Sequence, residues 1–492
     1  MLIPSKLSQK GLIQDPYELF MGEKSQLFLK KLEAEEHLND RIIEQIIYGN
    51  TDNSQTYRKL KSRFRRRLID EIYYGTFEKY NTGVRNQTMA LLLKQFSVAM
   101  ALKLDLFTNA YIYTIKEIHT KAKKFDLTMI SQLTVHELFY YYAFVNPDKK
   151  LMLQYKTEKE KVAEQVVYSD RAEVINGELS YIFTQEKYNP SKENRIIIRD
   201  RIQEINELSK LSDNFTLNVY KYDLSYYYYL VEKKYEELLI LSEEAKIYYD
   251  KKQILDKFFK WSQESNKIYA LILLKRYEKA ELAIESTFSW LTLGVRAWFY
   301  LSDFLFICYT MQSKFESAAD LVNKVLTQPS LKNFTFEITQ WESRFILLSL
   351  LASESKVQEK FSEVNYKLTP QRFLKKHSDL LKDKKAMNLT YRIIEIAFYI
   401  KNNKMGKVID IIENLGQFKY KYLRDNDTYR AQCFIRLLEV LAKSNFHPVR
   451  VNYLAEPILK KMKTKEAIIS SENAYAEILP FEEIWQRLIK LL

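Results

Sequence analysis

Apolar residues recur every three or four positions along almost the whole chain, and no segment alternates between apolar and polar residues over the length of a strand. This spacing places apolar side chains on one face of an α-helix. Residues 39–49 are a clear example, because Asn39 can cap the start of a helix and Gly49 can end it in the left-handed conformation. The pattern predicts an all-α protein of helices joined by short polar turns.

The pattern also divides the chain. Residues 1–24 contain two prolines and two glycines, so we expect a loosely structured lead-in there. Residues 25–80 are predicted to form a basic helical unit, and residues 81–492 a long helical-repeat region. Breaks between helices are expected at 146–150 and 187–195, where an Asn-Pro pair interrupts each helical pattern.

Two segments in the C-terminal half repeat one spacing, in which an aromatic residue is followed by apolar or small residues three, seven and ten positions on. These sets are Tyr277, Ala280, Ile284 and Thr287, and Phe315, Ala318, Val322 and Val325. Segments that start at Tyr235 and Met405 follow the pattern more loosely. The starts at 235, 277 and 315 are 42 and 38 residues apart, which is the length of a helical hairpin with its turns.

This spacing resembles the second half of the tetratricopeptide repeat, with Ala280 and Ile284, and Ala318 and Val322, at the matching positions. The first-half pattern with its Leu-Gly pair is missing. The resemblance implies helix hairpins stacked into an α-solenoid whose concave face binds a protein segment. The alternative is an irregular helical bundle, in which similar segments arise because aromatic and alanine-containing helices pack well.

Residues 57–72 predict a strongly basic amphipathic helix. When the side chains are placed at 100° per residue around the helix axis, the apolar ones form one stripe and the cationic ones occupy the opposite half of the surface. The stripe consists of Tyr57, Leu60, Phe64, Leu68 and Ile72, and the cationic half consists of Arg58, Lys59, Arg63, Arg65 and Arg66.

The order of two helices, a turn and a basic helix resembles the helix-turn-helix unit of winged-helix response regulators and of related activators with helical repeats. That resemblance implies that the five cationic residues contact nucleic acid. Two features disagree with it: the expected turn from Asn50 to Gln55 is long for this motif, and no β-wing follows. The alternative is the solvated face of a hairpin that caps the repeat region.

Composition narrows the function classes. Nine glycines and nine prolines in 492 residues are few for a β-rich or dinucleotide-binding fold. The formal net charge of +13 favours acidic partners. Cys308 and Cys433 form no disulfide framework, and no run of about 18 apolar residues occurs, so we expect a cytoplasmic protein without a membrane partner.

The sequence offers no catalytic or metal-binding pattern. The histidines, His37, His119, His136, His377 and His447, are far apart, and no glycine-rich phosphate loop or nucleophile elbow occurs. We therefore expect no enzymatic activity, no cofactor, no metal and no small-molecule ligand. The tyrosine clusters at 139–144 and 225–230 suggest base-stacking platforms, but consecutive tyrosines point about 100° apart on a helix, which favours packing.

The predicted function is a non-enzymatic protein-binding scaffold built on a tetratricopeptide-like solenoid. The alternative is a nucleic-acid-binding regulator that uses the basic helix, with the repeat region as a sensor.

Overall fold

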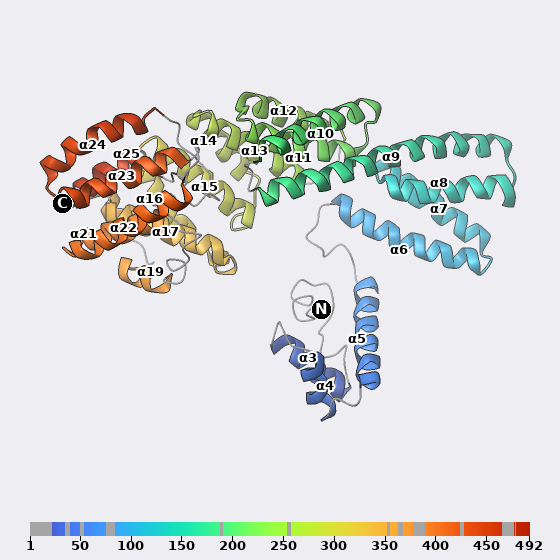
Figure 1. Ribbon diagram of the computed structural model, residues 1–492. Coiled ribbons are helices and arrows are strands. Elements are labelled where there is room, and N and C mark those ends of the chain that lie inside the picture. The colour runs from blue at the N-terminus through green and yellow to red at the C-terminus, as the bar shows by residue number, and fades with distance from the viewer. Residues whose placement is uncertain are drawn as a thin grey trace. The chain divides into compact units, whose positions relative to one another are not determined.

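The computed structural model describes residues 22–34, 40–49, 54–74, 84–186, 190–252, 257–351, 355–362, 368–377, 389–423, 428–464, 477 and 479–492. All regular secondary structure in these ranges is helical, which confirms the all-α prediction (Figure 1). The elements are α3 (Glu23–Ala34), α4 (Asp40–Tyr48), α5 (Ser54–Tyr74), α6 (Val84–Leu104), α7 (Thr108–Lys124), α8 (Thr128–Tyr140), the π-helix η2 (Tyr141–Val145), α9 (Lys149–Gln185), α10 (Lys192–Leu211), α11 (Phe215–Val231), α12 (Tyr235–Lys251), α13 (Lys257–Leu273), α14 (Tyr277–Phe288), α15 (Arg296–Met311), α16 (Phe315–Leu326), the 3-10 helix η3 (Pro329–Asn333), α17 (Thr335–Leu351), α18 (Ser355–Ser362), α19 (Pro370–Lys376), α21 (Leu389–Lys401), α22 (Met405–Tyr422), α23 (Tyr429–Lys443), α24 (Pro448–Met462) and α25 (Phe481–Ile489).

Several predicted helix ends can be compared with the structure. Gly49 ends α4 with a φ of 77°, as expected of a left-handed C-terminal glycine. The basic helix α5 begins at Ser54. The expected turn from Asn50 to Gln55 is therefore wrong at its C-terminal end, because Ser54 and Gln55 belong to the helix. The interruption between η2 and α9 covers only residues 146–148 of the expected break at 146–150, and α10 begins at Lys192, inside the expected break at 187–195. Asn39 and residues 1–21 lie outside the described residues.

Contacts between Cα atoms divide the chain into two compact units. Unit 1 contains residues 1–232 and 244–260, and unit 2 contains residues 233–243 and 261–492. The division falls inside α12. The predicted boundary at residue 80 between a basic unit and a repeat region stays a prediction.

Within each unit, helices pack mainly on their neighbours in the chain. In unit 1 these contacts run from α6 through α11, and in unit 2 they run from α14 to α17 and from α21 to α24. This is the arrangement expected when each helix has an apolar stripe and short turns return the chain antiparallel to the preceding helix.

One type of turn joins many of these helices. In the turn between α15 and α16, Ser313 has a φ of 59°, its N–H donates to the carbonyl of Thr310, and the N–H of Lys314 donates to the carbonyl of Tyr309. This pair of hydrogen bonds defines the Schellman motif, which satisfies the last carbonyls of a helix. The same geometry occurs at Leu106, Asp126, Lys275 and Asn403, so all five of these turns use a residue other than glycine in the left-handed conformation.

The segments with repeated spacing occupy equivalent places. Tyr277, Phe315, Tyr235 and Met405 are the first residues of α14, α16, α12 and α22, respectively. Each begins just after a turn whose left-handed residue is Lys275, Ser313, Lys233 or Asn403. In α14 and α16 the small and large apolar positions have no exposed surface; these residues are Ala280, Ile284, Ala318 and Val322.

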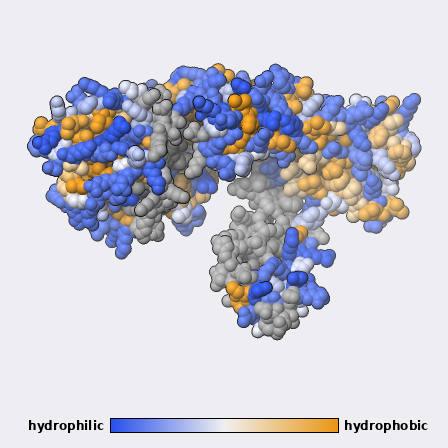
Figure 2. All heavy atoms as spheres, viewed as in Figure 1, coloured by the Kyte–Doolittle hydropathy of each residue, from blue (hydrophilic) through white to orange (hydrophobic). Residues whose placement is uncertain are grey.

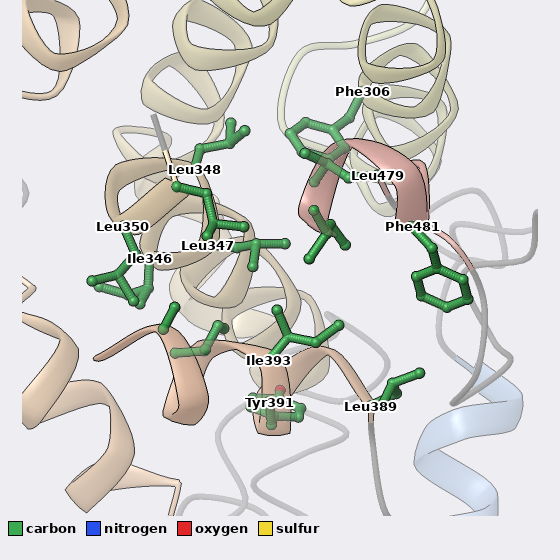
Figure 3. Packing of buried hydrophobic residues seen from close by; sticks show 14 of the residues in the cluster. Phe306, Ile346, Leu347, Leu348, Leu350, Leu389, Tyr391, Ile393, Leu479 and Phe481 are labelled. Carbon is green, nitrogen blue, oxygen red and sulfur yellow. The ribbon is translucent and has the colours of Figure 1, made fainter. Parts of the chain in front are cut away.

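Unit 2 also contains a contact between helices far apart in sequence. Helix α25 packs against α17, and the Arg487 guanidinium donates to the backbone carbonyl of Leu351 over 3.0 Å. Figure 3 shows part of this core, which includes Leu479, Phe481 and apolar side chains of α17 and α21. The C-terminal helix therefore closes onto the middle of unit 2, which a purely sequential stack of hairpins would not require.

Candidate protein-binding groove and basic helix face

Helix α5 is positioned by a small aromatic core that it shares with α3 and α4. The ring of Phe28 meets the rings of Tyr57 and Phe64 edge to face, at centroid distances of 6.1 and 5.0 Å. The Tyr57 hydroxyl donates to Asp40 over 3.0 Å, and Lys61 forms an ion pair with the same carboxylate at 2.7 Å. The hydrogen bond from Lys61 lowers the pKa of the Asp40 carboxyl. These contacts fix which face of α5 turns inward.

The predicted cationic residues lie on the other face of α5. Arg58, Lys59, Arg63, Arg65 and Arg66 are exposed, and they form no ion pair with the residues that the structure describes. Arg67 is also exposed, whereas Lys61 is half-buried by its contact with Asp40. The side chains of Leu68 and Ile72, the last two residues of the predicted apolar stripe, are not among those that the structure describes. Within the described residues, no carboxylate neutralises this cationic face.

The two tyrosine clusters differ in how far their side chains are buried. In α11, Tyr227 packs on Phe183 of α9, and Tyr227 and Tyr228 both contact the apolar core around them. In the cluster at 139–144, Tyr141 and Tyr142 are buried, but Tyr140 and Phe144 are exposed and contact each other at a centroid distance of 5.1 Å. Packing accounts for the first cluster and for only part of the second.

The exposed aromatic pair belongs to an apolar stripe along α8 and η2. Met129, Leu133, His136, Tyr140 and Phe144 follow one another at spacings of three or four residues, which places them on one helix face. Met129 is 75% exposed and Phe144 is 70% exposed. The opposite face of α8 is buried, so this stripe is an outward face without a covering helix among the described residues.

Helices α6 and α9 lie on either side of this stripe and turn it into a groove, which we call the α8 groove. A pocket of about 280 Å³ is lined by Phe96 of α6, by Leu133 and His136 of α8, and by Lys159 and Ala163 of α9. Helix α6 also carries the exposed apolar side chains Met89, Leu93 and Leu104. Figure 2 shows hydrophobic residues gathered over the α6–α8 region.

Polar contacts beneath the groove hold its helices together. Lys103 of α6 forms an ion pair with Glu137 of α8 at 2.6 Å, and the Tyr111 hydroxyl of α7 donates to the same carboxylate. Glu137 is almost fully buried, so both partners compensate its loss of hydration. Burial and the neighbouring carboxylate raise the pKa of Tyr111. Three consecutive helices are therefore linked through one carboxylate directly under the exposed stripe.

The rim of the groove is cationic. Lys159 lies 3.2 Å from His136 Nδ1 and 5.1 Å from the centroid of the Phe139 ring, and it forms no ion pair with the described residues. Helix α6 contains no Asp or Glu, and the only carboxylate of α8 is the buried Glu137. The groove thus combines an apolar floor with an unneutralised cation at one edge.

Two histidines and both cysteines of the described part of the chain are buried. His119 is buried between Thr134 and Glu158, and His377 contacts the buried Glu342 at 2.8 Å. Burial raises the pKa of the Cys308 thiol to about 12 and raises that of Cys433, so neither is an activated nucleophile. Within the described residues no group of three or more His, Cys, Asp or Glu side chains could hold a metal ion.

The sequence reasoning did not find the α8 groove. A signal was present, because positions 129, 133, 136, 140 and 144 form a helical stripe, but a stripe of this kind normally marks a buried face. Only the neighbouring helices determine that it faces outward.

Among the helices described, none is both long enough and apolar enough to cross a membrane. Comparisons with family models, with curated proteins and with solved structures found no match to this chain.

Proposed function

We propose that this chain is a non-enzymatic scaffold, built as a tetratricopeptide-like solenoid, which binds a protein partner in the α8 groove. The solenoid is supported by the repeated Schellman turns and by the equivalent buried positions in α14 and α16, namely Ala280, Ile284, Ala318 and Val322. The observation that carries the function is the exposed stripe from Met129 to Phe144, because contiguous apolar surface of this kind is typical of an interaction site.

Affinity capture with a groove variant tests this proposal. Leu133→Asp places a charge in the groove at a position that is 41% exposed, so the fold tolerates it. Tyr181→Asp is the control, because Tyr181 of α9 is also exposed and does not line the pocket. Quantitative mass spectrometry should recover a protein with the wild type and with Tyr181→Asp, but not with Leu133→Asp. Equal recovery by all three proteins would contradict the proposal.

A second candidate function is nucleic-acid binding through α5, and the open cationic face of that helix favours it. The five exposed cations on this face would neutralise phosphates, and such binding weakens steeply as salt increases. Replacing Arg63, Arg65 and Arg66 by Ala should weaken binding to duplex DNA or RNA and flatten the salt dependence of log K by about 2 to 3. Unchanged affinity and unchanged salt dependence would exclude this function.

A further inference from the structure

The shape of the α8 groove restricts the kind of segment that fits it. Its floor runs from Met129 to Phe144, a length of about 22 Å at the rise of an α-helix. The described residues provide no strand edge to which an extended peptide could add. A floor with apolar side chains at spacings of three and four between two helices matches a helix-in-groove mode, in which anchors recur along one face of the ligand.

The charges around the groove restrict the chemistry of that segment. Among the residues that line the pocket, the carboxylate Glu137 is buried and already paired with Lys103 of α6. The α9 wall also carries Glu160 and Glu164, which follow the lining residues Lys159 and Ala163 in the chain. Lys159 adds a cation at the α9 edge that has no acidic partner within the described residues. A basic ligand would be repelled here, whereas an acidic one would gain Coulomb attraction close to an apolar surface.

The side chains of the floor suit a helical ligand of variable sequence. Met129 is exposed, and the flexible side chain of a methionine lets a groove adapt to different apolar anchors. Tyr140 and Phe144 offer rigid aromatic surface at the other end of the stripe.

From this geometry we infer that the α8 groove binds an amphipathic α-helix of about four turns, with apolar anchors on one face and Glu or Asp beside them. The inference rests on the proposed function and specifies the partner of the same site. The carboxylates of the ligand lie over Lys159, and its apolar anchors cover Leu133, Tyr140 and Phe144.

The test uses the full chain and three fluorescein-labelled peptides of about 18 residues, a length that covers the groove. The first peptide has a Leu stripe flanked by Glu, the second has Lys in place of every Glu, and the third has two central Pro residues that break the helix. Fluorescence anisotropy should show binding of the first peptide alone. Phe144→Ala should weaken it at least about tenfold, and Tyr181→Ala should leave it unchanged. Lys159→Glu should weaken the acidic peptide and strengthen the basic one.

The inference is overturned by any of three results. These are no binding of the acidic peptide up to about 100 µM, equal binding of the acidic and basic peptides, or a Phe144-dependent dimer in analytical ultracentrifugation, which would make a second copy the occupant. If the affinity capture still recovers a protein that depends on Leu133, the proposed function survives and only the acidic-helix chemistry fails. If neither experiment depends on the groove, both fail.

Discussion

Replacing Asp223 of α11 should change the stability of the fold by an amount that depends on pH. Burial raises the pKa of this carboxyl to about 6, and the described residues offer it neither a hydrogen bond nor an ion pair. Its charge helps to raise the pKa values of Tyr220 and Tyr249. The folded state of unit 1 therefore holds a carboxylate that is poorly hydrated and uncompensated.

The magnitude and the sign follow from proton linkage. The difference between the ordinary pKa of 3.8 and a value of about 6 corresponds to a penalty of about 3 kcal/mol when the group is ionised in both states. A raised pKa in the folded state means that the penalty is full above pH 6, decreases as the pH falls through 6, and disappears below 3.8. Asp223→Asn should therefore stabilise the fold by about 3 kcal/mol at pH 7.5 and by about 1 kcal/mol at pH 4.5.

Hydrogen exchange of α11 peptides, corrected for the pH dependence of intrinsic exchange, measures this local free energy of unfolding. Tryptophan fluorescence does not, because all five tryptophans lie in unit 2. Asp200→Asn is the matched control, since Asp200 of α10 is exposed. The difference in the free energy of unfolding between Asp223→Asn and wild type should grow with pH. The same difference for Asp200→Asn should not change with pH. A difference that does not change between pH 4.5 and 7.5 would refute the reasoning.

Two further changes act within unit 2, where tryptophan fluorescence during urea unfolding reports the result. Arg344→Met should lower the free energy of unfolding by about 3 to 5 kcal/mol, because it leaves the buried Asp303 carboxylate without its ion-pair partner. Adding Asp303→Leu should recover most of the lost stability. If the double variant is as unstable as the single one, the broken ion pair is not the cause. Ser313→Gly should raise the free energy of unfolding by about 0.5 to 1 kcal/mol, because glycine adopts the left-handed φ of 59° without steric cost. A decrease would mean that this turn carries no strain.

The sequence predicted features that local patterns determine. Helical periodicity gave the all-α class, and a glycine at position 49 marked a helix end that the structure places there. The start of α5 was misplaced because Ser54 and Gln55, which are polar and follow a turn-like run, were assigned to the turn. Helix ends made by Leu106 or Ser313 escaped prediction, because nothing in these residues indicates a positive φ.

The interaction surface depends on tertiary structure. Six consecutive residues at 139–144 are mostly aromatic, and the sequence alone could not separate the buried Tyr141 and Tyr142 from the exposed Tyr140 and Phe144. That separation arises because α6 and α9 flank α8 without covering its outer face. The basic helix was easier to interpret, since its apolar stripe and cationic half are both explicit in the spacing of residues 57–66.

Site-specific photo-crosslinking tests most directly whether the α8 groove is the binding site. The photoreactive residue p-benzoylphenylalanine is placed at position 144 in the groove, or at position 181 on the exposed side of α9, in the full chain within its source cells. The account predicts a discrete covalent protein adduct after irradiation from position 144 and none from position 181. The absence of an adduct from position 144, or the same adducts from both positions, would contradict it.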